Sequence, residues 1–361
     1  MKTTTLRSMV LALALVAGAS RSLAQVVVET IAPKTAVFHA SAQAKKDAVP
    51  SFSMIVPREG RPGDGGVMVK PVFTSRDGKQ VVTVRVEAGT SLYGTGEVAG
   101  PLLRNGQKAT LWNHDAYGYD DKTPHLYQSH PWVLGVRADG SSFGLIFDSS
   151  YRQVITMPPT SGGDIVAEVD GVAFPVVVIE RATPGEVVTA LSDLTGRMPL
   201  PPKWSLGFHQ CRYSYFPDTQ VMEIAKGFRD RKIPCDVIWH DIDYMHKFLC
   251  FTFDEKHFPD PTRHNADLHK LGFHTVWMID PGIGAEKAKH PAGGYSVYES
   301  GTAIDAWVKR ADGTTYQGEV WPGWCVFPDY TRRETRTWWA GLYKDFMATG
   351  IDGVWNDMNE P

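Results

Sequence analysis

The segment Ile351-Asp-Gly-Val-Trp-Asn-Asp-Met-Asn-Glu-Pro361 decides how the second half of this chain folds. Its short apolar run, with Val354 and Trp355, is typical of a buried β-strand, and it ends abruptly in amide and carboxylate side chains. Carboxylates at the end of a buried strand are poorly solvated, so their pKa values can be tuned for acid, base or nucleophilic chemistry. Pro361 prevents simple continuation of the strand. The segment therefore predicts a functional site where a buried strand ends.

Two earlier segments repeat this pattern, namely Asp236-Val-Ile-Trp-His-Asp241 and Thr275-Val-Trp-Met-Ile-Asp280. Each is a β-rich run that carries a tryptophan and closes on an aspartate. Taken singly, such a strand is better explained by a tryptophan in the core and an aspartate in a turn. Three repeats favour one wall of one site, in which Trp239, Trp277 and Trp355 face the C–H surfaces of a sugar and carboxylates bind its hydroxyls.

Composition and the N-terminus limit the function classes. The 361 residues fit about two domains, and a net charge of −3 gives no electrostatic reason to expect nucleic acid. Residues 1–24 combine Lys2 and Arg7 with an apolar run and small residues at Ser22-Leu-Ala24, as a cleavable signal peptide does. We therefore expect export, with no membrane span in the mature chain because the apolar run is too short.

Residues 25–181 predict a β-sandwich domain. Alternating or β-rich runs occupy residues 81–86, 132–136, 143–147 and 176–179, and no convincing amphipathic helix interrupts them. Hairpin turns are expected at Asp77-Gly78, Asp139-Gly140 and Asp170-Gly171. Sheet-forming runs without helices favour two stacked antiparallel sheets.

Residues 182–203 form a connector between two domains. A helix is expected from Ala182 to Arg197, because Thr183 can cap it, Pro184 suits its first position and Glu186 completes a capping box. The prolines at 199, 201 and 202 then mark the domain boundary.

Residues 204–361 alternate strands with helices. Strands are expected at 205–209, 236–241, 275–280 and 351–357, with helices at 218–231 (capped by Asp218), 260–270 and 331–349 (ending at Gly350). This alternation is typical of a parallel sheet with crossover helices. Four such strands are half of a (β/α)8 TIM barrel, which needs about 250 residues. We therefore expect the sequence to be the N-terminal portion of a longer protein.

Trp355-Asn-Asp-Met-Asn-Glu360 resembles the nucleophile motif of glycoside hydrolase family 31, the retaining α-glucosidase family. Asp241-Ile-Asp-Tyr-Met245 and Ile279-Asp-Pro-Gly-Ile283 are similar to two further motifs of that family, in the same order. The similarity covers most of the chain after residue 24. It implies a galactose-mutarotase-like sandwich followed by the first half of a TIM barrel.

The resemblance also assigns roles to residues. It implies that Asp357 is the nucleophile and that Asp241 binds sugar hydroxyls, while Glu360 is either an assisting carboxylate or a structural hydrogen-bonding group. The apolar wall of the first sugar subsite would consist of Ile279, Trp321, Trp355 and Met358. The family's acid/base carboxylate belongs to a motif on a later strand that is missing here, so the chain alone is expected to be inactive.

Two of these assignments have plain structural alternatives. Trp321 could equally be a hydrophobic plug under its loop. Asp115 lies in the segment Trp112–Tyr119, which looks like the family's loop that touches the leaving sugar, but it could also be part of a solvated turn.

Neither a cofactor nor a metal is predicted. Gly94-x-Gly96-x-x-Ala99 formally fits a dinucleotide fingerprint, but Gly100-Pro101 would end the helix that such a fingerprint must open. We interpret it as a tight turn. The histidines form no metal-binding pair at helical spacing, and the four cysteines match neither a zinc set nor a redox pair. Disulfide pairing stays open, and Cys211 is expected to be a buried thiol.

The sequence thus predicts an exported, retaining exo-α-glucosidase acting on an oligosaccharide or α-glucoside. Asn356 and Met358 beside the nucleophile favour α-glucosidase over α-xylosidase. A transglucosidase uses the same residues and stays open. The alternatives from other classes are a non-catalytic carbohydrate-binding protein and a nucleotide-dependent oxidoreductase. The oligomeric state is left open.

Overall fold

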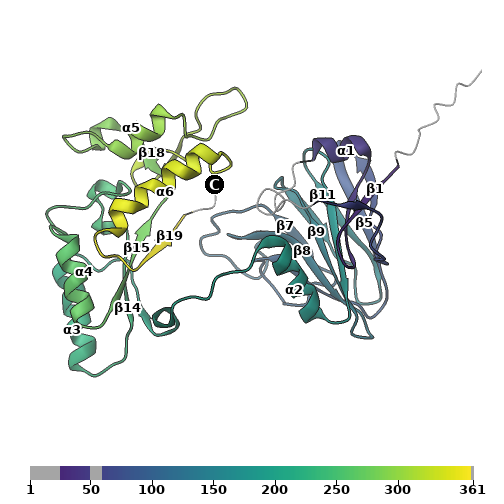
Figure 1. Ribbon diagram of the computed structural model, residues 1–361, viewed down its shortest axis with the longest axis horizontal. Helices are drawn as coiled ribbons and strands as arrows, with labels where there is room; N and C mark the ends of the chain where they lie inside the picture. Colours follow the sequence, from purple (N-terminus) through teal and green to yellow (C-terminus); the bar gives the residue numbers. More distant parts are fainter. Residues whose placement is uncertain (1–24, 49–58, 359–361) are drawn as a thin grey trace, which may run out of the picture. The chain divides into compact units, whose positions relative to one another are not determined.

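The computed structural model describes residues 25–48 and 59–358, and the chain divides into two compact units at Arg197/Met198 (Figure 1). The predicted signal peptide and Glu360 therefore lie outside the described residues. None of the helices in the described ranges combines the length and hydropathy that a bilayer crossing requires.

The first unit is a sandwich of two antiparallel sheets, as predicted. One sheet has the order β3-β1-β2-β12-β9-β8-β6 and the other β4-β5-β11-β10-β7. The strands of the larger sheet are β3 (Arg61–Pro62), β1 (Val27–Ala32), β2 (Thr35–His39), β12 (Val176–Arg181), β9 (Ser142–Phe147), β8 (Ser129–Val136) and β6 (Ser91–Gly96). Those of the smaller sheet are β4 (Val72–Arg76), β5 (Lys79–Val86), β11 (Gly163–Val169), β10 (Gln153–Thr156) and β7 (Lys108–Leu111).

Strand β12 shows how the period of two builds this unit. Val176 and Val178 belong to the core between the sheets, whereas Val177 and Ile179 belong to a separate cluster on the outer face. Helix α2 (Pro184–Thr195) covers that outer face with Val187, Ala190 and Leu194, which lie in the same outer cluster (Figure 1).

The α2 helix begins as the sequence predicted. The Thr183 hydroxyl accepts from the Glu186 N–H at 3.3 Å, and the Glu186 carboxylate accepts from the Thr183 N–H at 3.1 Å. Two of the N–H groups that a helix start leaves unpaired are thereby satisfied.

Two of the three predicted hairpin turns are confirmed, and the third is wrong. Asp77-Gly78 joins the paired strands β4 and β5, and Asp139-Gly140 joins β8 and β9. Asp170-Gly171 instead carries the chain from β11 in one sheet to β12 in the other. Gly171 has φ +107°, and a Cβ there would lie 2.7 Å from the Tyr151 ring. A glycine is therefore required at this crossover for the same reason as in a hairpin turn, and the two cannot be told apart from the local sequence.

The first unit also contains a short helix that the sequence did not predict. Helix α1 (Ala42–Asp47) is capped by the Ser41 hydroxyl, which accepts from the Ala44 N–H at 3.0 Å. It buries only Ala44, so its sequence carries almost no amphipathic signal.

The second unit contains a four-stranded parallel sheet in the order β13-β14-β15-β19, in agreement with the predicted half barrel. The strands are β13 (His209–Gln210), β14 (Val237–His240), β15 (His274–Ile279) and β19 (Gly353–Asn356). The helices are α3 (Asp218–Asp230), α4 (Pro261–Lys270), α5 (Ser296–Ala303) and α6 (Arg333–Met347). A small antiparallel sheet of β16 (Ile283–Gly284), β18 (Gly323–Val326) and β17 (Gly318–Val320) follows β15.

Four details of this unit differ from the sequence predictions. The strand expected at 205–209 is largely a 3₁₀ turn over Lys203–Leu206, and β13 begins only at His209. Gly207 lies between them, and a Cβ on Gly207 would lie 2.0 Å from the Asp236 carboxylate. Asp218 is the first residue of α3 rather than its cap, since Pro217 precedes it and no side-chain cap forms. Helix α6 ends at Met347, before Gly350, and α5 and the small sheet were not predicted.

Candidate active site

Three aspartates follow three adjacent parallel strands of the second unit. Asp241 follows β14, Asp280 follows β15 and Asp357 follows β19, and β15 pairs with both of the other strands. Because parallel strands end at the same edge of their sheet, these residues share one edge.

Asp241 is partly buried and electrostatically linked to Asp357. Its carboxylate caps the 3₁₀ turn Ile242–Tyr244 by accepting from the Ile242 N–H at 2.7 Å. Burial raises the pKa of Asp241; the hydrogen bond from Ile242 opposes that rise, and the negative charges of Asp357 and Asp243 add to it. The carboxylate of Asp357 thus lies close enough to Asp241 for its charge to raise the pKa of Asp241.

Asp357 stands where the chain leaves β19. Its backbone N–H donates to the Ile279 carbonyl at 3.0 Å, which extends the β15–β19 ladder by one step beyond the Ile279–Asn356 pair. Met358 then has φ +50°, in the left-handed region, so the chain turns as soon as the ladder ends. The half-buried Asp357 and Met358 side chains remain at the edge of the sheet.

Trp355 packs on a neighbouring indole of the same sheet face. Its ring lies edge-on to Trp239, with 5.5 Å between centroids and 62° between planes. The Trp239 Nε1–H donates to Nδ1 of His209 at 3.1 Å. Both tryptophans are half-buried, so this face carries aromatic surface close to Asp241 and Asp357.

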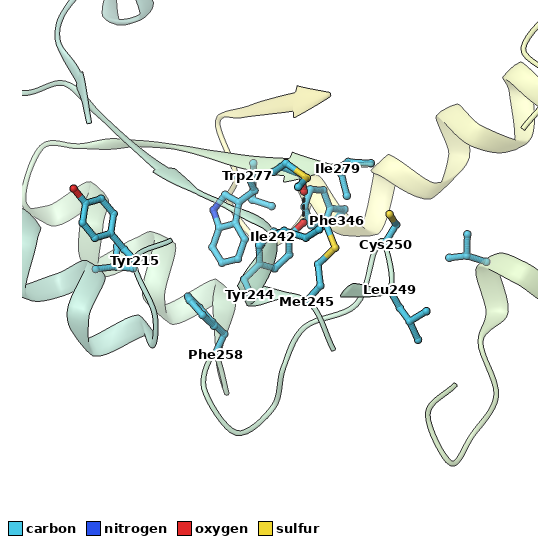
Figure 2. Packing of buried hydrophobic residues seen from close by; sticks show 14 of the residues in the cluster. Tyr215, Ile242, Tyr244, Met245, Leu249, Cys250, Phe258, Trp277, Ile279 and Phe346 are labelled. Atoms are coloured by element: carbon cyan, nitrogen blue, oxygen red, sulfur yellow. Dashed lines mark hydrogen bonds between the residues drawn. The ribbon is translucent and has the colours of Figure 1, made fainter. Parts of the chain in front are cut away.

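Trp277 does not belong to that wall, contrary to the sequence prediction. It is 0% exposed, stacks on His240 with 4.0 Å between centroids, and donates to the Asn265 Oδ1 of α4 at 3.0 Å. Figure 2 shows it among buried side chains of the unit's core. Trp277 stands three residues before its aspartate, whereas Trp239 and Trp355 stand two before theirs, and an odd step along a strand reverses the face.

Ile279 is also buried in this core, 1% exposed (Figure 2). Its backbone carbonyl accepts from the Asp357 N–H, and the residue also lines a cavity of about 510 Å³ beside helix α6. The cavity is lined by Ile279, Asp280, Pro281, Tyr330, Arg336, Trp339, Ala340, Tyr343 and Asn356.

Trp321 lies in the turn between β17 and β18 and is 44% exposed, so it is not a buried plug. Its ring contacts Tyr213 at 5.8 Å and Phe248 at 5.6 Å between centroids. Tyr213 is 59% exposed and was not identified from the sequence. Tyr213 follows the parallel strand β13, but the sequence predicts that this strand starts four residues earlier, at Ser205.

Cys211 is exposed, which corrects the expectation of a buried thiol. It follows β13 directly, and so it lies on the sheet edge that carries the aspartates. Partial burial raises the pKa of the Cys211 thiol, and the carboxylates of Asp241 and Asp357 raise it further. All four cysteines are within the described residues and carry free thiols.

Asp115 belongs to the first unit, in the loop after β7. It is exposed, and its carboxylate accepts from the Tyr127 hydroxyl at 2.8 Å. The loop therefore offers a carboxylate whose orientation is fixed by at least one hydrogen bond.

The glycines at 94 and 96 form a bulged strand rather than the predicted tight turn. They lie in β6, paired with β8, and a Cβ at Gly94 would lie 2.4 Å from the Trp132 carbonyl oxygen. A dinucleotide fingerprint must join a strand to a helix, and β6 does not. Within the described residues, His, Cys, Asp and Glu side chains form no group of three or more that could hold a metal ion.

Two family models match the chain. The glycosyl hydrolases family 31 TIM-barrel domain matches residues 198–361, and the glycosyl hydrolase 31 N-terminal galactose mutarotase-like domain matches residues 28–155. Together they cover well over half of the sequence.

Named relatives agree with these matches. Alpha-glucosidase 2 of Bacillus thermoamyloliquefaciens is 42% identical over 270 residues, which are 74% of this chain and 33% of the relative. The alpha-glucosidase of Mucor javanicus is 35% identical over 285 residues, 78% of this chain and 32% of the relative. The chain thus spans about a third of the length of these curated relatives.

Solved structures give the same fold. A family 31 alpha-glucosidase from Bacteroides thetaiotaomicron is 49% identical, with a TM-score of 0.69, covering 80% of this chain and 48% of that one. A Flavobacterium johnsoniae dextranase reaches a TM-score of 0.81 at 22% identity, covering 94% of this chain and 46% of that one, and supports the fold alone.

Proposed function

Because the chain belongs to glycosyl hydrolase family 31, we propose that the protein is a retaining, exo-acting α-glucosidase, which releases terminal α-linked glucose from an oligosaccharide or α-glucoside. The relatives named alpha-glucosidase in Bacillus and Mucor support this substrate class.

The observation that carries the proposal is the pairing of Asp241 and Asp357 at one sheet edge. The strands that carry them flank β15, and the negative charge of Asp357 contributes to the raised pKa of Asp241. Half-buried indole surface from Trp239 and Trp355 lies on the same face. A sugar ring needs both features, because its hydroxyls bind carboxylates and its C–H surface packs on aromatic rings.

In this proposal Asp357 attacks the anomeric carbon as the bond to the leaving oxygen breaks, which gives a covalent glucosyl ester that water then hydrolyses. Asp241 accepts hydrogen bonds from hydroxyls of the same sugar. Trp321, Trp355 and Met358 form its apolar wall, and Glu360 assists the nucleophile.

A second carboxylic acid, other than Asp357, supplies the proton for the leaving group in this mechanism. Asp241 has a raised pKa, but its carboxylate lies near Asp357 and caps the turn Ile242–Tyr244. This position fits a residue that binds the hydroxyls of the sugar better than one that protonates the leaving oxygen. We also propose that residues 1–24 direct export of the protein and are then removed by cleavage, on the basis of the N-terminal sequence.

Mechanism-based labelling tests the proposal. A fluorinated glucosyl reagent that forms a slowly hydrolysed ester should add one sugar to the peptide containing Asp357 in the full-length protein. An unlabelled Asp357 in a protein that still binds glucose would instead favour a carbohydrate-binding protein without turnover. A glucosyl ester that is released to a sugar acceptor faster than to water would assign a transglucosidase.

A further inference from the structure

We infer that Tyr343 is a positioning residue for Asp357 and acts through the side chain of Asn356. The inference rests on the proposed function. It starts from one hydrogen bond, in which the Tyr343 hydroxyl donates to Oδ1 of Asn356 at 2.8 Å. Asn356 is the last residue of β19 and immediately precedes the proposed nucleophile.

Tyr343 is held rigidly enough to act as a fixed donor. It lies in α6, and its ring packs edge-on against Phe251, with 5.1 Å between centroids and 89° between planes. Trp339, one helical turn earlier, contacts it at 6.1 Å. Burial raises the pKa of Tyr343 to about 12, so the hydroxyl keeps its proton throughout the range in which the enzyme is expected to work.

Asn356 needs such a support because of its place in the sheet. Its backbone is paired with Ile279 of β15 at the last register position. Up to Met358, where the described residues end, the Asp357 N–H bond alone continues the ladder beyond it. The Asn356 side chain is exposed, and Met358 already turns away with φ +50°. The backbone ladder attaches this strand end to β15. The hydrogen bond from Tyr343 adds a side-chain attachment to α6.

A defined strand end matters for the proposed chemistry. A carboxylate oxygen of Asp357 must reach the anomeric carbon in line with the departing oxygen, and small misplacements of a reacting group cost rate rather than affinity. Tyr343 lies on the helix side of the strand and reaches Asn356, so its loss is expected to change kcat more than KM.

The test compares Tyr343→Phe with Tyr330→Phe in the full-length protein, using a chromogenic α-glucoside. Tyr330 lines the same cavity and also packs on Trp339, so its variant removes a hydroxyl from the same wall without touching the donor to Asn356. We expect Tyr343→Phe to lower kcat by about fivefold with KM nearly unchanged. Tyr330→Phe should stay within about twofold of the parent.

A double-mutant cycle with Asn356→Ala separates positioning from general packing. If Tyr343 acts through Asn356, the double variant should lose no more kcat than Asn356→Ala alone, because the same hydrogen bond is missing in both. Hydrogen exchange of residues 353–358 supplies a readout besides activity: Tyr343→Phe should speed exchange of the Asp357 amide, and Tyr330→Phe should not.

Additive losses in the cycle, or a Tyr343→Phe enzyme with unchanged kcat and unchanged Asp357 exchange, would overturn the inference and leave the proposed function intact. Failure of the parent protein to form a glucosyl ester on Asp357 would instead overturn the proposed function and the inference with it.

Discussion

His240 and His264 share a hydrogen bond inside the second unit, with 2.9 Å between their Nε2 atoms. His240 ends β14, directly before Asp241, and His264 lies in α4, so the bond fastens a helix to the strand that delivers a candidate sugar ligand. Both imidazoles are buried, and His240 stacks on Trp277. Only one proton can occupy the space between the two nitrogens.

This pair predicts a loss of stability in acid. Burial lowers the pKa of His264 to about 4, against the opposing effect of Asp218 and Asp267. Burial and the charge of His264 lower the pKa of His240 well below its usual value. The unfolded chain therefore binds more protons than the folded chain below about pH 6.5, and stability should fall as the pH drops from about 6.5 towards 4. Urea unfolding of the chain at pH 7.5, 6.5, 5.5 and 4.5 measures this slope. His264→Gln should flatten it, whereas the exposed His130→Gln should not, and equal slopes in all three proteins would contradict the prediction.

Trp277 and Trp321 should respond to substitution in opposite ways. Trp277→Ala removes a fully buried indole and leaves Asn265 without its donor, so it should destabilise the second unit by about 3–5 kcal/mol. Trp321→Ala removes a half-exposed ring and should cost less than about 1.5 kcal/mol, yet weaken glucose binding in the full-length protein. Thermal unfolding and calorimetric titration with glucose measure the two effects. A stable Trp277→Ala variant would disprove the core assignment.

Asp357 and Asp241 should also differ in their kinetic signatures. Asp357→Ala in the full-length protein removes the proposed nucleophile and should reduce kcat by about four orders of magnitude or more. Asp241→Asn keeps the shape but weakens hydroxyl binding, and we expect a raised KM together with a reduced kcat. Steady-state rates on a chromogenic α-glucoside check both. Turnover that survives Asp357→Ala unchanged would refute the assignment of the nucleophile.

Cys211 should be the reactive thiol of the native chain. It is exposed, whereas Cys235, Cys250 and Cys325 are buried, so iodoacetamide should modify Cys211 first. Because burial and the neighbouring carboxylates raise its pKa, the modification rate should still be climbing above pH 9. Peptide mass spectrometry after timed labelling at pH 7, 8, 9 and 10 measures this. In the full-length protein a bound glucose analogue should slow the labelling, and a Cys211→Ser chain provides the unlabelled control.

The sequence by itself determined the sandwich, the strand–helix alternation that follows it and the positions of the strand-end carboxylates. Alternating or β-rich runs define strands of the sandwich, and the capping box at Thr183 and Glu186 defines the start of α2, because both depend only on neighbouring residues. The alternation of strands and helices after residue 204 then requires parallel strands, whose ends carry Asp241, Asp280 and Asp357. The motifs that begin at Asp241, Ile279 and Trp355 indicated glycoside hydrolase family 31.

Tertiary structure decided which side chains meet. Trp277 faces α4 and Trp355 faces Trp239 because strand register assigns alternate residues to opposite faces, and register is fixed by partners far away in the sequence. Asp170-Gly171 lies in a crossover because β12 pairs with strands of the other sheet, and the residues of a turn do not specify with which strand the next one pairs. The contacts of Tyr213 with Trp321, and of Tyr343 with Asn356, likewise join segments that only folding brings together.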